Sequence, residues 1–213
     1  MSRTGAETRD HILATTERML DHGDFASISL LEICTAADVS SSSLYHFFRT
    51  KEDLCAALHE RLLERSVARL SGFTDALREL SDPLDDRIRF AITAASFHLI
   101  DHRGYLTSMA NLERSRADLR RQRAQFHRGM VAAITEALVA PSPDVSPDVP
   151  VRLELAMRVV ASTLIGAFTD GGLVYADDLP PKDLAAELTT MVSAYVREGG
   201  PIGAGGRAGG TAA

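Results

Sequence analysis

Hydroxyl side chains mark three closely spaced helix starts in the first quarter of the chain. Ser29-Leu-Leu-Glu32 and Thr50-Lys-Glu-Asp53 each place a hydroxyl three residues before a carboxylate. This is the pattern of a capping box, in which each of the two side chains accepts a hydrogen bond from a free backbone N–H of the first turn. Ser40 lies between them and is placed to cap a third start, at Ser41. Starts this close together predict short helices joined by tight turns.

The remainder of the chain repeats its apolar residues at intervals of three and four rather than two, so we predict an all-α fold. About nine helices are expected, over residues 7–22, 30–36, 41–47, 51–73, 84–102, 105–112, 116–139, 151–175 and 182–197. A Pro-rich linker is expected at 140–150. The resulting division is an N-terminal domain at 1–50, a larger helical domain at 51–198 and a disordered Gly-rich tail at 199–213.

Composition limits the possible functions of the 213-residue chain. Its net charge of −6 excludes a protein that coats nucleic acid, because such binding needs many cations on one face. Any contact with DNA must therefore be local. The only two cysteines, Cys34 and Cys55, fall inside helical patterns and are expected to be buried rather than bridged. No apolar stretch reaches the roughly 20 residues of a spanning helix, and the N-terminus lacks a secretory pattern. A cytoplasmic protein with no membrane partner is expected.

Residues 29–54, SLLEICTAADVSSSSLYHFFRTKEDL, have the order of a helix-turn-helix: a capped helix, a tight turn and a second short helix. This stretch resembles the signature of TetR-type (tetracycline-repressor) DNA-binding domains, and with the first helix the resemblance covers about fifty residues. Three positions depart from the family pattern. Asp38 and Ser42 stand where Gly is common, and Cys34 where Ala is usual. Asp tolerates the left-handed backbone of a turn better than most residues, so the turn is expected to form.

The resemblance implies a DNA-binding transcriptional regulator, a repressor released from a palindromic double-stranded operator by a small-molecule effector. Serines at the start of the second motif helix are placed to meet base edges or phosphates, and Lys51 to hold a phosphate at a helix N-terminus. The expected DNA-binding residues are Ser29, Ser41, Ser42, Ser43, Tyr45, His46 and Lys51. Arg3 and Arg9 are weaker candidates. Inward-facing positions are expected at Ile33, Ala37, Val39, Leu44 and Phe48.

The larger domain is expected to bind the effector and to form a homodimer. Its segment 151–175 is apolar on nearly every face, so one side can line a pocket and the other an interface. The pocket candidates are Phe97, Ile100, Tyr105, Met109, Phe126, Met130, Ile165, Phe168 and Thr169, although ordinary core packing is the commoner role for each apolar one taken singly. The interface candidates are Leu164, Leu188, Met191, Val192 and Tyr195.

Other interpretations were weighed against this one. His98, His102 and His127 suggest a metal cluster, but no partner at ligand spacing completes the set. An arginine-rich run at 114–128 could receive an anionic ligand, yet it circles its helix and is better explained as a solvated surface. A di-iron enzyme would need paired Glu-x-x-His motifs, and no His in the chain has Glu three residues before it. No enzyme activity and no cofactor are therefore expected. A helical interaction protein, with its aromatic residues in the core, would leave the motif match unexplained.

Overall fold

The computed structural model describes residues 4–20, 25–103, 106–107, 110, 113, 116–142, 145–169 and 180–198. Over these residues every element of secondary structure is a helix, as predicted. The helices are α1 (Gly5–Leu20), α2 (Leu30–Ala37), α3 (Ser41–Phe47), α4 (Lys51–Glu79), α5 (Leu84–Asp101), α7 (Ala117–Val139), α8 (Val149–Thr169) and α9 (Pro181–Glu198). Among the described residues no helix is long and apolar enough to cross a membrane.

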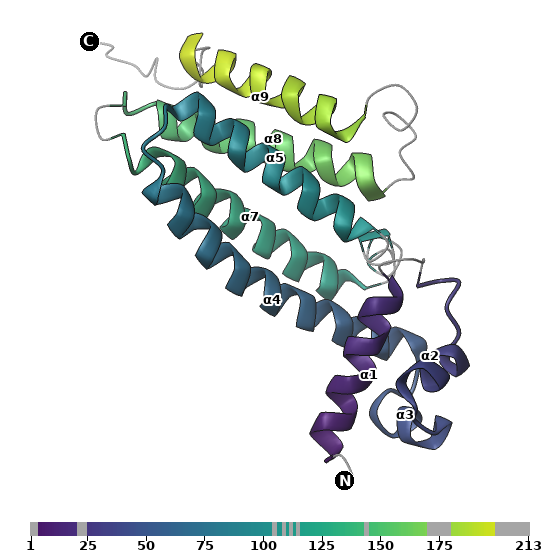
Figure 1. Cartoon of the computed structure of the whole chain (residues 1–213). Coiled ribbons are helices and arrows are strands. Elements are labelled where there is room, and N and C mark those ends of the chain that lie inside the picture. Colours follow the sequence, from purple (N-terminus) through teal and green to yellow (C-terminus); the bar gives the residue numbers. More distant parts are fainter. Residues whose placement is uncertain are drawn as a thin grey trace, which may run out of the picture.

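Helices α1, α2 and α3 surround the first turns of α4 at one end of the molecule (Figure 1). Their shared core is built on fully buried side chains from each element, such as Ile12, Ile33, Leu44 and Leu54. Leu58 also belongs to this N-terminal core. The N-terminal core therefore includes side chains of α4 that follow residue 50, the domain boundary expected from the sequence.

The remaining helices form a bundle in which α4 packs on α7, α7 on α8, and α9 lies across α5 and α8 (Figure 1). Its core contains Leu77 of α4, Ile88 and Ile92 of α5, Leu138 of α7 and Leu153 of α8, all fully buried. Because α4 contributes to both cores, one uninterrupted helix joins the two parts of the molecule.

Helix α4 is longer than the sequence pattern predicted, ending at Glu79 instead of near Phe73. The interval of three and four continues through the buried side chains of Thr74 and Leu77. No proline intervenes before Pro83, and a single glycine, Gly72, weakens a helix interior without ending it. Helix α8 also begins earlier, at Val149, inside the segment expected to be a linker. Its first turn accommodates Pro150 because the first N–H groups of a helix have no intrahelical acceptor.

Candidate functional site

The capping box predicted for α2 is present with both hydrogen bonds. The Glu32 backbone N–H donates to Ser29 Oγ at 3.2 Å, and the Ser29 N–H donates to Glu32 Oε2 at 2.7 Å. The Ser29 hydroxyl also donates to the same carboxylate oxygen at 2.7 Å. These bonds lower the pKa of Glu32. Ser29 is exposed, but its hydroxyl is already engaged in capping the start of α2, which makes it a weaker DNA contact than the sequence suggested.

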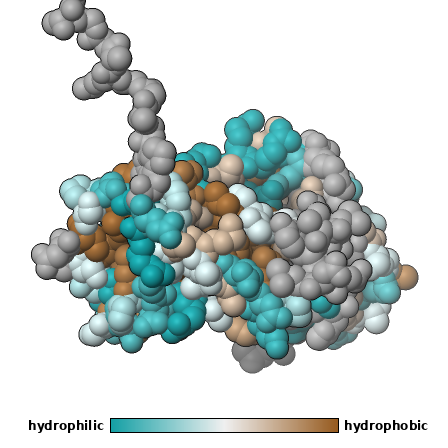
Figure 2. Space-filling model, turned by 90° about the horizontal axis from the view of Figure 1, so that it is seen from above, coloured by the Kyte–Doolittle hydropathy of each residue, from teal (hydrophilic) through white to brown (hydrophobic). Residues whose placement is uncertain are grey.

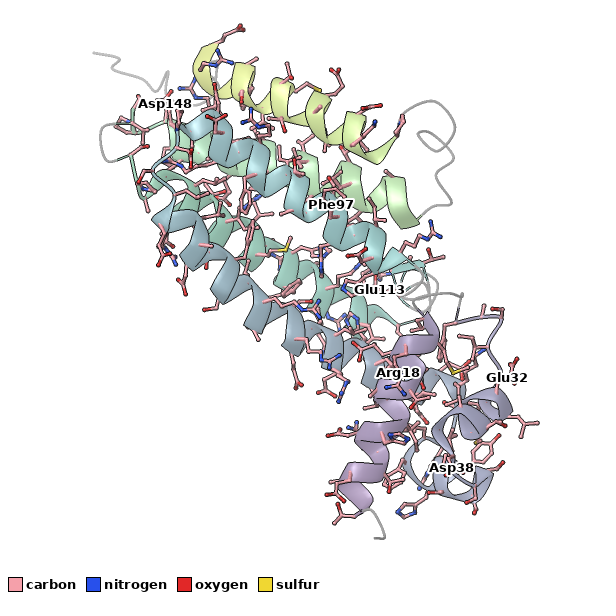
Figure 3. The ribbon with its side chains drawn as sticks, in the orientation of Figure 1. Arg18, Glu32, Asp38, Phe97, Glu113 and Asp148 are labelled. Carbon is pink, nitrogen blue, oxygen red and sulfur yellow. The ribbon has the colours of Figure 1, made fainter. Side chains whose placement is uncertain are left out.

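The turn after α2 depends on a left-handed residue. Asp38 has φ 50° and ψ 52°, and within the described residues it is the only residue other than glycine with positive φ. Its N–H donates to the Thr35 carbonyl at 3.3 Å, and the next N–H, of Val39, donates to the Cys34 carbonyl at 3.0 Å. These two bonds close the end of α2 and set the direction in which α3 leaves. Figure 3 shows Glu32 on α2 and Asp38 in the turn that follows it.

Replacing Asp38 by glycine is expected to stabilise the fold. Glycine adopts left-handed backbone angles without the steric penalty of a side chain, which for Asp is already reduced. We expect the free energy of unfolding to rise by about 0.5 kcal/mol in Asp38→Gly and to fall by about 1–2 kcal/mol in Asp38→Val. Urea unfolding at constant m-value measures both. A stability ranking with Val above Asp would contradict strain at this turn.

Helix α3 packs one side against the N-terminal core and exposes the other side to solvent. Ser40 caps it, with the Ser43 N–H donating to Ser40 Oγ at 3.1 Å. Leu44 is fully buried, and Phe48, just after the helix, is 2% exposed. The opposite side carries most of the predicted DNA contacts. These are Ser41, Ser42, Tyr45 and His46, all exposed. Ser43 is half-buried at the edge of this set.

Lys51 lies at the start of α4, beside this open face. Its Nζ donates to the Ala26 carbonyl at 3.1 Å and stands 4.9 Å from the centre of the Phe25 ring. An ammonium group has three N–H donors, so donors remain for a phosphate. Arg9 packs its guanidinium over Phe48, 5.6 Å from the ring centre, and Arg3 lies outside the described residues. The structure therefore brings Ser41, Ser42, Tyr45, His46 and Lys51 to one end of the molecule.

A groove with a volume of about 540 Å³ runs between α4 and α7. Two of the predicted pocket residues, Phe126 and Met130, line it. The full lining comprises Glu60, Leu63, Glu64, Val67 and Leu70 from α4, and Gln122, Gln125, Phe126, Gly129 and Met130 from α7. None of these α4 residues was among the pocket residues predicted from the sequence.

Of the other predicted pocket residues, those that the structure describes do not line this groove. Phe97 is 60% exposed on α5 (Figure 3), and Ile100 and Ile165 are half-buried. Tyr105 and Met109 lie outside the described residues, as do the side chains of Phe168 and Thr169. Of the three histidines that suggested a metal cluster, His98 and His102 pack ring edge to face with centres 4.5 Å apart. The described residues contain no group of three side chains placed to hold a metal ion.

Three of the five residues predicted for the dimer interface lie inside the subunit. Leu164, Leu188 and Val192 are 1%, 6% and 4% exposed and belong to the bundle core. The buried face of α9, spaced at three and four residues, packs on α5 and α8, so these side chains are covered without a partner. Tyr195 is half-buried against the same core, and Met191 is 63% exposed.

A different apolar stripe is exposed on α8. Val151, Leu155 and Val159 follow one another at intervals of four and are 54%, 49% and 55% exposed. The small residues Ser162 and Gly166 continue the stripe. Figure 2 shows hydrophobic side chains reaching the surface among hydrophilic ones on the face seen from above. The sequence carried the signal for this stripe, since α8 is apolar on two sides, but periodicity alone does not say which side faces out.

A polar cluster lies where the N-terminal unit meets the bundle. His59 of α4 is 1% exposed, and burial, with Arg123 nearby, lowers its pKa to about 4. Burial, with Arg123 and His59 nearby, likewise lowers the pKa of His127 to about 4. Arg123 Nη2 lies 2.8 Å from Glu113 Oε2, and burial raises the pKa of this carboxyl. Figure 3 shows Glu113 near the end of α1. Ion pairs from Glu17 to two arginines of α4, Arg61 and Arg65, join α1 to the same region.

Comparison with known proteins matches residues 12–58 to the family described as bacterial regulatory proteins, tetR family. The chain is 28% identical over 141 residues to the HTH-type transcriptional repressor NemR of Escherichia coli K12, covering 63% of this chain and 69% of that protein. It is 32% identical over 81 residues to the HTH-type transcriptional regulator EthR of Mycolicibacterium smegmatis, covering 38% and 36%.

Among solved structures, the fold is similar to that of a tetR-family transcriptional regulator from Mesorhizobium loti. The TM-score is 0.70 at 13% identity, covering 92% of this chain and 98% of the other. The family match falls on the unit that carries Asp38, α3 and the start of α4. Residues 12–58 are therefore a DNA-binding domain of the tetR family, and the chain is a DNA-binding transcriptional regulator.

Proposed function

We propose that the chain acts in the cytoplasm as a homodimer that represses transcription from a two-fold symmetric operator and releases it when a small molecule occupies the groove between α4 and α7. The observation that carries this proposal is that α3 has one buried side and one exposed side. Leu44 is buried and fixes the helix, while Tyr45 and His46 of the same turn are exposed. A helix anchored on one side and polar on the other is suited to lie in a major groove.

The exposed side chains of α3 are suited to two different roles, contact with bases and contact with phosphates. Ser41 and Ser42 stand in the first turn, from which a recognition helix contacts base edges. Their short hydroxyls can bond to several bases and therefore discriminate only weakly among them. Tyr45 and His46 supply longer donors toward phosphates or bases. Lys51 adds a charged donor at the start of the next helix. These phosphate contacts would fix the register in which α3 meets the bases.

We assign the dimer interface to the exposed stripe of α8, with Met191 of α9 at its side. Val151, Leu155 and Val159 present apolar surface that the subunit itself leaves uncovered. A second copy related by a two-fold axis would cover the same stripe on each subunit. Two recognition helices then meet successive major grooves about 34 Å apart, which is why the operator should be palindromic.

Helix α4 provides the connection between ligand and DNA. It has 29 residues and is thus roughly 43 Å long. Lys51 occupies its first turn, and Glu60, the first groove residue, follows roughly 14 Å along the same axis. A ligand that separates α4 from α7 would tilt α4 and change the distance between the two recognition helices. Release of DNA requires only that the ligand bind the tilted dimer better than the DNA-bound one.

The test is binding to the DNA that lies upstream of the gene for this protein. Fluorescence anisotropy at 0.15 M salt should give an affinity at least about 1,000-fold higher for the target segment than for a scrambled duplex of equal length. Footprinting should then show two protected half-sites with centres about one helical turn apart. Equal affinity for both duplexes, across all segments of the upstream region, would refute sequence-specific regulation at this locus.

Lys51→Ala is expected to weaken binding to target and scrambled DNA by similar factors. Because Lys51 is proposed to neutralise one phosphate per subunit, its loss should reduce the slope of log K against log salt by about one unit per subunit. The chain's other lysine, Lys182, is exposed at the start of α9 and gives the matched control, Lys182→Ala, with no change expected. A loss confined to the target sequence with an unchanged salt slope would assign Lys51 to base recognition instead.

A further inference from the structure

We propose that the groove between α4 and α7 is selective for amphipathic organic cations, in which a single positive charge is attached to an aromatic or aliphatic body. This inference rests on the proposed function in one respect, namely that the groove is the effector site. It goes further by naming the chemical class that the groove accepts.

The apolar part of the groove accounts for the body of such a ligand. Leu63, Leu70, Phe126 and Met130 contribute half-buried apolar side chains, and Val67 is 57% exposed. Gly129 adds free space, since a Cβ built at this position meets nothing within 4 Å. Apolar surface that a subunit leaves open in a concave site is the usual feature of a small-molecule site.

The charge of the groove accounts for the cation. Glu60 and Glu64 lie one helical turn apart on α4, and both are exposed. Within the described part of the chain neither carboxylate forms a salt bridge. Like charges at this spacing repel one another, so a cation between them removes an unfavourable interaction as well as adding a favourable one.

The opposite wall has no charge that would offset these carboxylates. It presents the amides of Gln122 and Gln125 and the ring of Phe126. Although α7 is rich in arginine, none of its arginines lines the groove. An aromatic ring attracts a nearby cation through its negative face. The same groove would repel a carboxylate or phosphate ligand, which excludes the anionic class that the arginine-rich sequence of α7 suggested.

The sharpest test compares two ions of the same shape and opposite charge, tetraphenylphosphonium and tetraphenylborate, by calorimetry on the full-length protein. We expect the cation to bind at least about tenfold more tightly than the anion, since both carboxylates attract the cation and repel the anion. The double variant Glu60→Gln with Glu64→Gln should lose this preference. The control, Glu79→Gln with Glu187→Gln, removes the same charge from exposed positions outside the groove and should keep it.

A second variant tests the location independently of charge. Gly129→Leu places a side chain in the open space of the groove and replaces a helical glycine by a better helix former. It should weaken binding of tetraphenylphosphonium about tenfold or more while circular dichroism shows unchanged helix content. Cation preference that survives both the double Gln variant and Gly129→Leu would overturn the inference, and so would equal binding of the two ions by the wild type.

Measuring the same titrations with operator DNA present separates this inference from the proposed function. If the groove is the effector site, DNA-bound protein should bind the cation 5- to 150-fold more weakly than free protein, the usual range of coupling between two sites. Cation selectivity that depends on Glu60 and Glu64 but is the same with and without DNA would support the inference and refute the groove as the effector site.

Discussion

Leu155→Glu combined with Val159→Glu is expected to convert the proposed dimer into a folded monomer. Both side chains are about half exposed in the single subunit, so two carboxylates there remain hydrated when the chain is alone. In a dimer the same carboxylates would face their copies across the two-fold axis, and burying unpaired charges costs several kcal/mol. Operator affinity should fall about 100-fold or more, because a monomer holds only one half-site.

Leu188→Glu should behave differently, although the sequence pattern had assigned this residue to the same interface. Leu188 is 6% exposed in the bundle core, where a charge has no partner. We expect a loss of about 4 kcal/mol or more in the free energy of unfolding, a large part of the stability of a typical domain. Ala132→Glu, on the exposed side of α7, is the control and should change neither the oligomeric state nor the free energy of unfolding.

Sedimentation equilibrium and thermal melting by circular dichroism distinguish the two outcomes. A double α8 variant that stays dimeric at micromolar concentration would place the interface elsewhere. A well-folded Leu188→Glu monomer would return that residue to the interface.

Acidification from pH 7 to pH 4 is expected to remove about 3 kcal/mol of stability through His59 alone. Burial, with Arg123 nearby, lowers the pKa of His59 to about 4 in the folded protein, against about 6.5 in the unfolded chain. The unfolded state therefore binds more protons throughout this window, and the free energy of unfolding rises with pH. The contribution is complete above pH 6.5 and is lost as the pH falls toward 4.

Substitution of His59 isolates this contribution from those of other titrating groups. Near pH 5 the wild type should gain about 1 kcal/mol of stability per pH unit relative to His59→Leu. His46→Gln, at an exposed position of α3, is the control and should follow the wild type. Urea unfolding at pH 7, 6, 5 and 4.5 measures the slopes. Parallel curves for wild type and His59→Leu would mean that the folded protein accommodates the protonated ring.

The local features of the fold were predictable because their causes are local. The hydroxyls of Ser29, Ser40 and Thr50 stand at the N-termini of α2, α3 and α4, as predicted. A cap depends on residues within one turn, and so the sequence contains all the information needed to place it. The exposed Tyr45 and His46 followed from the same reasoning, once the phase of α3 was fixed by Leu44.

The features that sequence reasoning missed depend on which helix packs against which. Helix α8 is apolar on two sides, and only the positions of α5, α7 and α9 decide that Leu164 is covered and Leu155 is not. The groove also depends on helix packing, since Glu60 and Glu64 are ordinary surface residues of α4 until α7 brings Phe126 beside them. Periodicity defines the faces of a helix but not its neighbours.

The burial of both cysteines makes the surface of this protein suitable for site-specific labelling. Cys34 and Cys55 are 5% and 3% exposed, and burial raises the pKa of Cys55 to about 12, which leaves almost no reactive thiolate at neutral pH. A single cysteine introduced at an exposed site near α3, such as Arg49, would then be the preferred point of attachment for a spin label. In the proposed dimer, dipolar spectroscopy would report the separation of the two α3 helices directly in solution, with and without ligand, and without removing any native residue of the core.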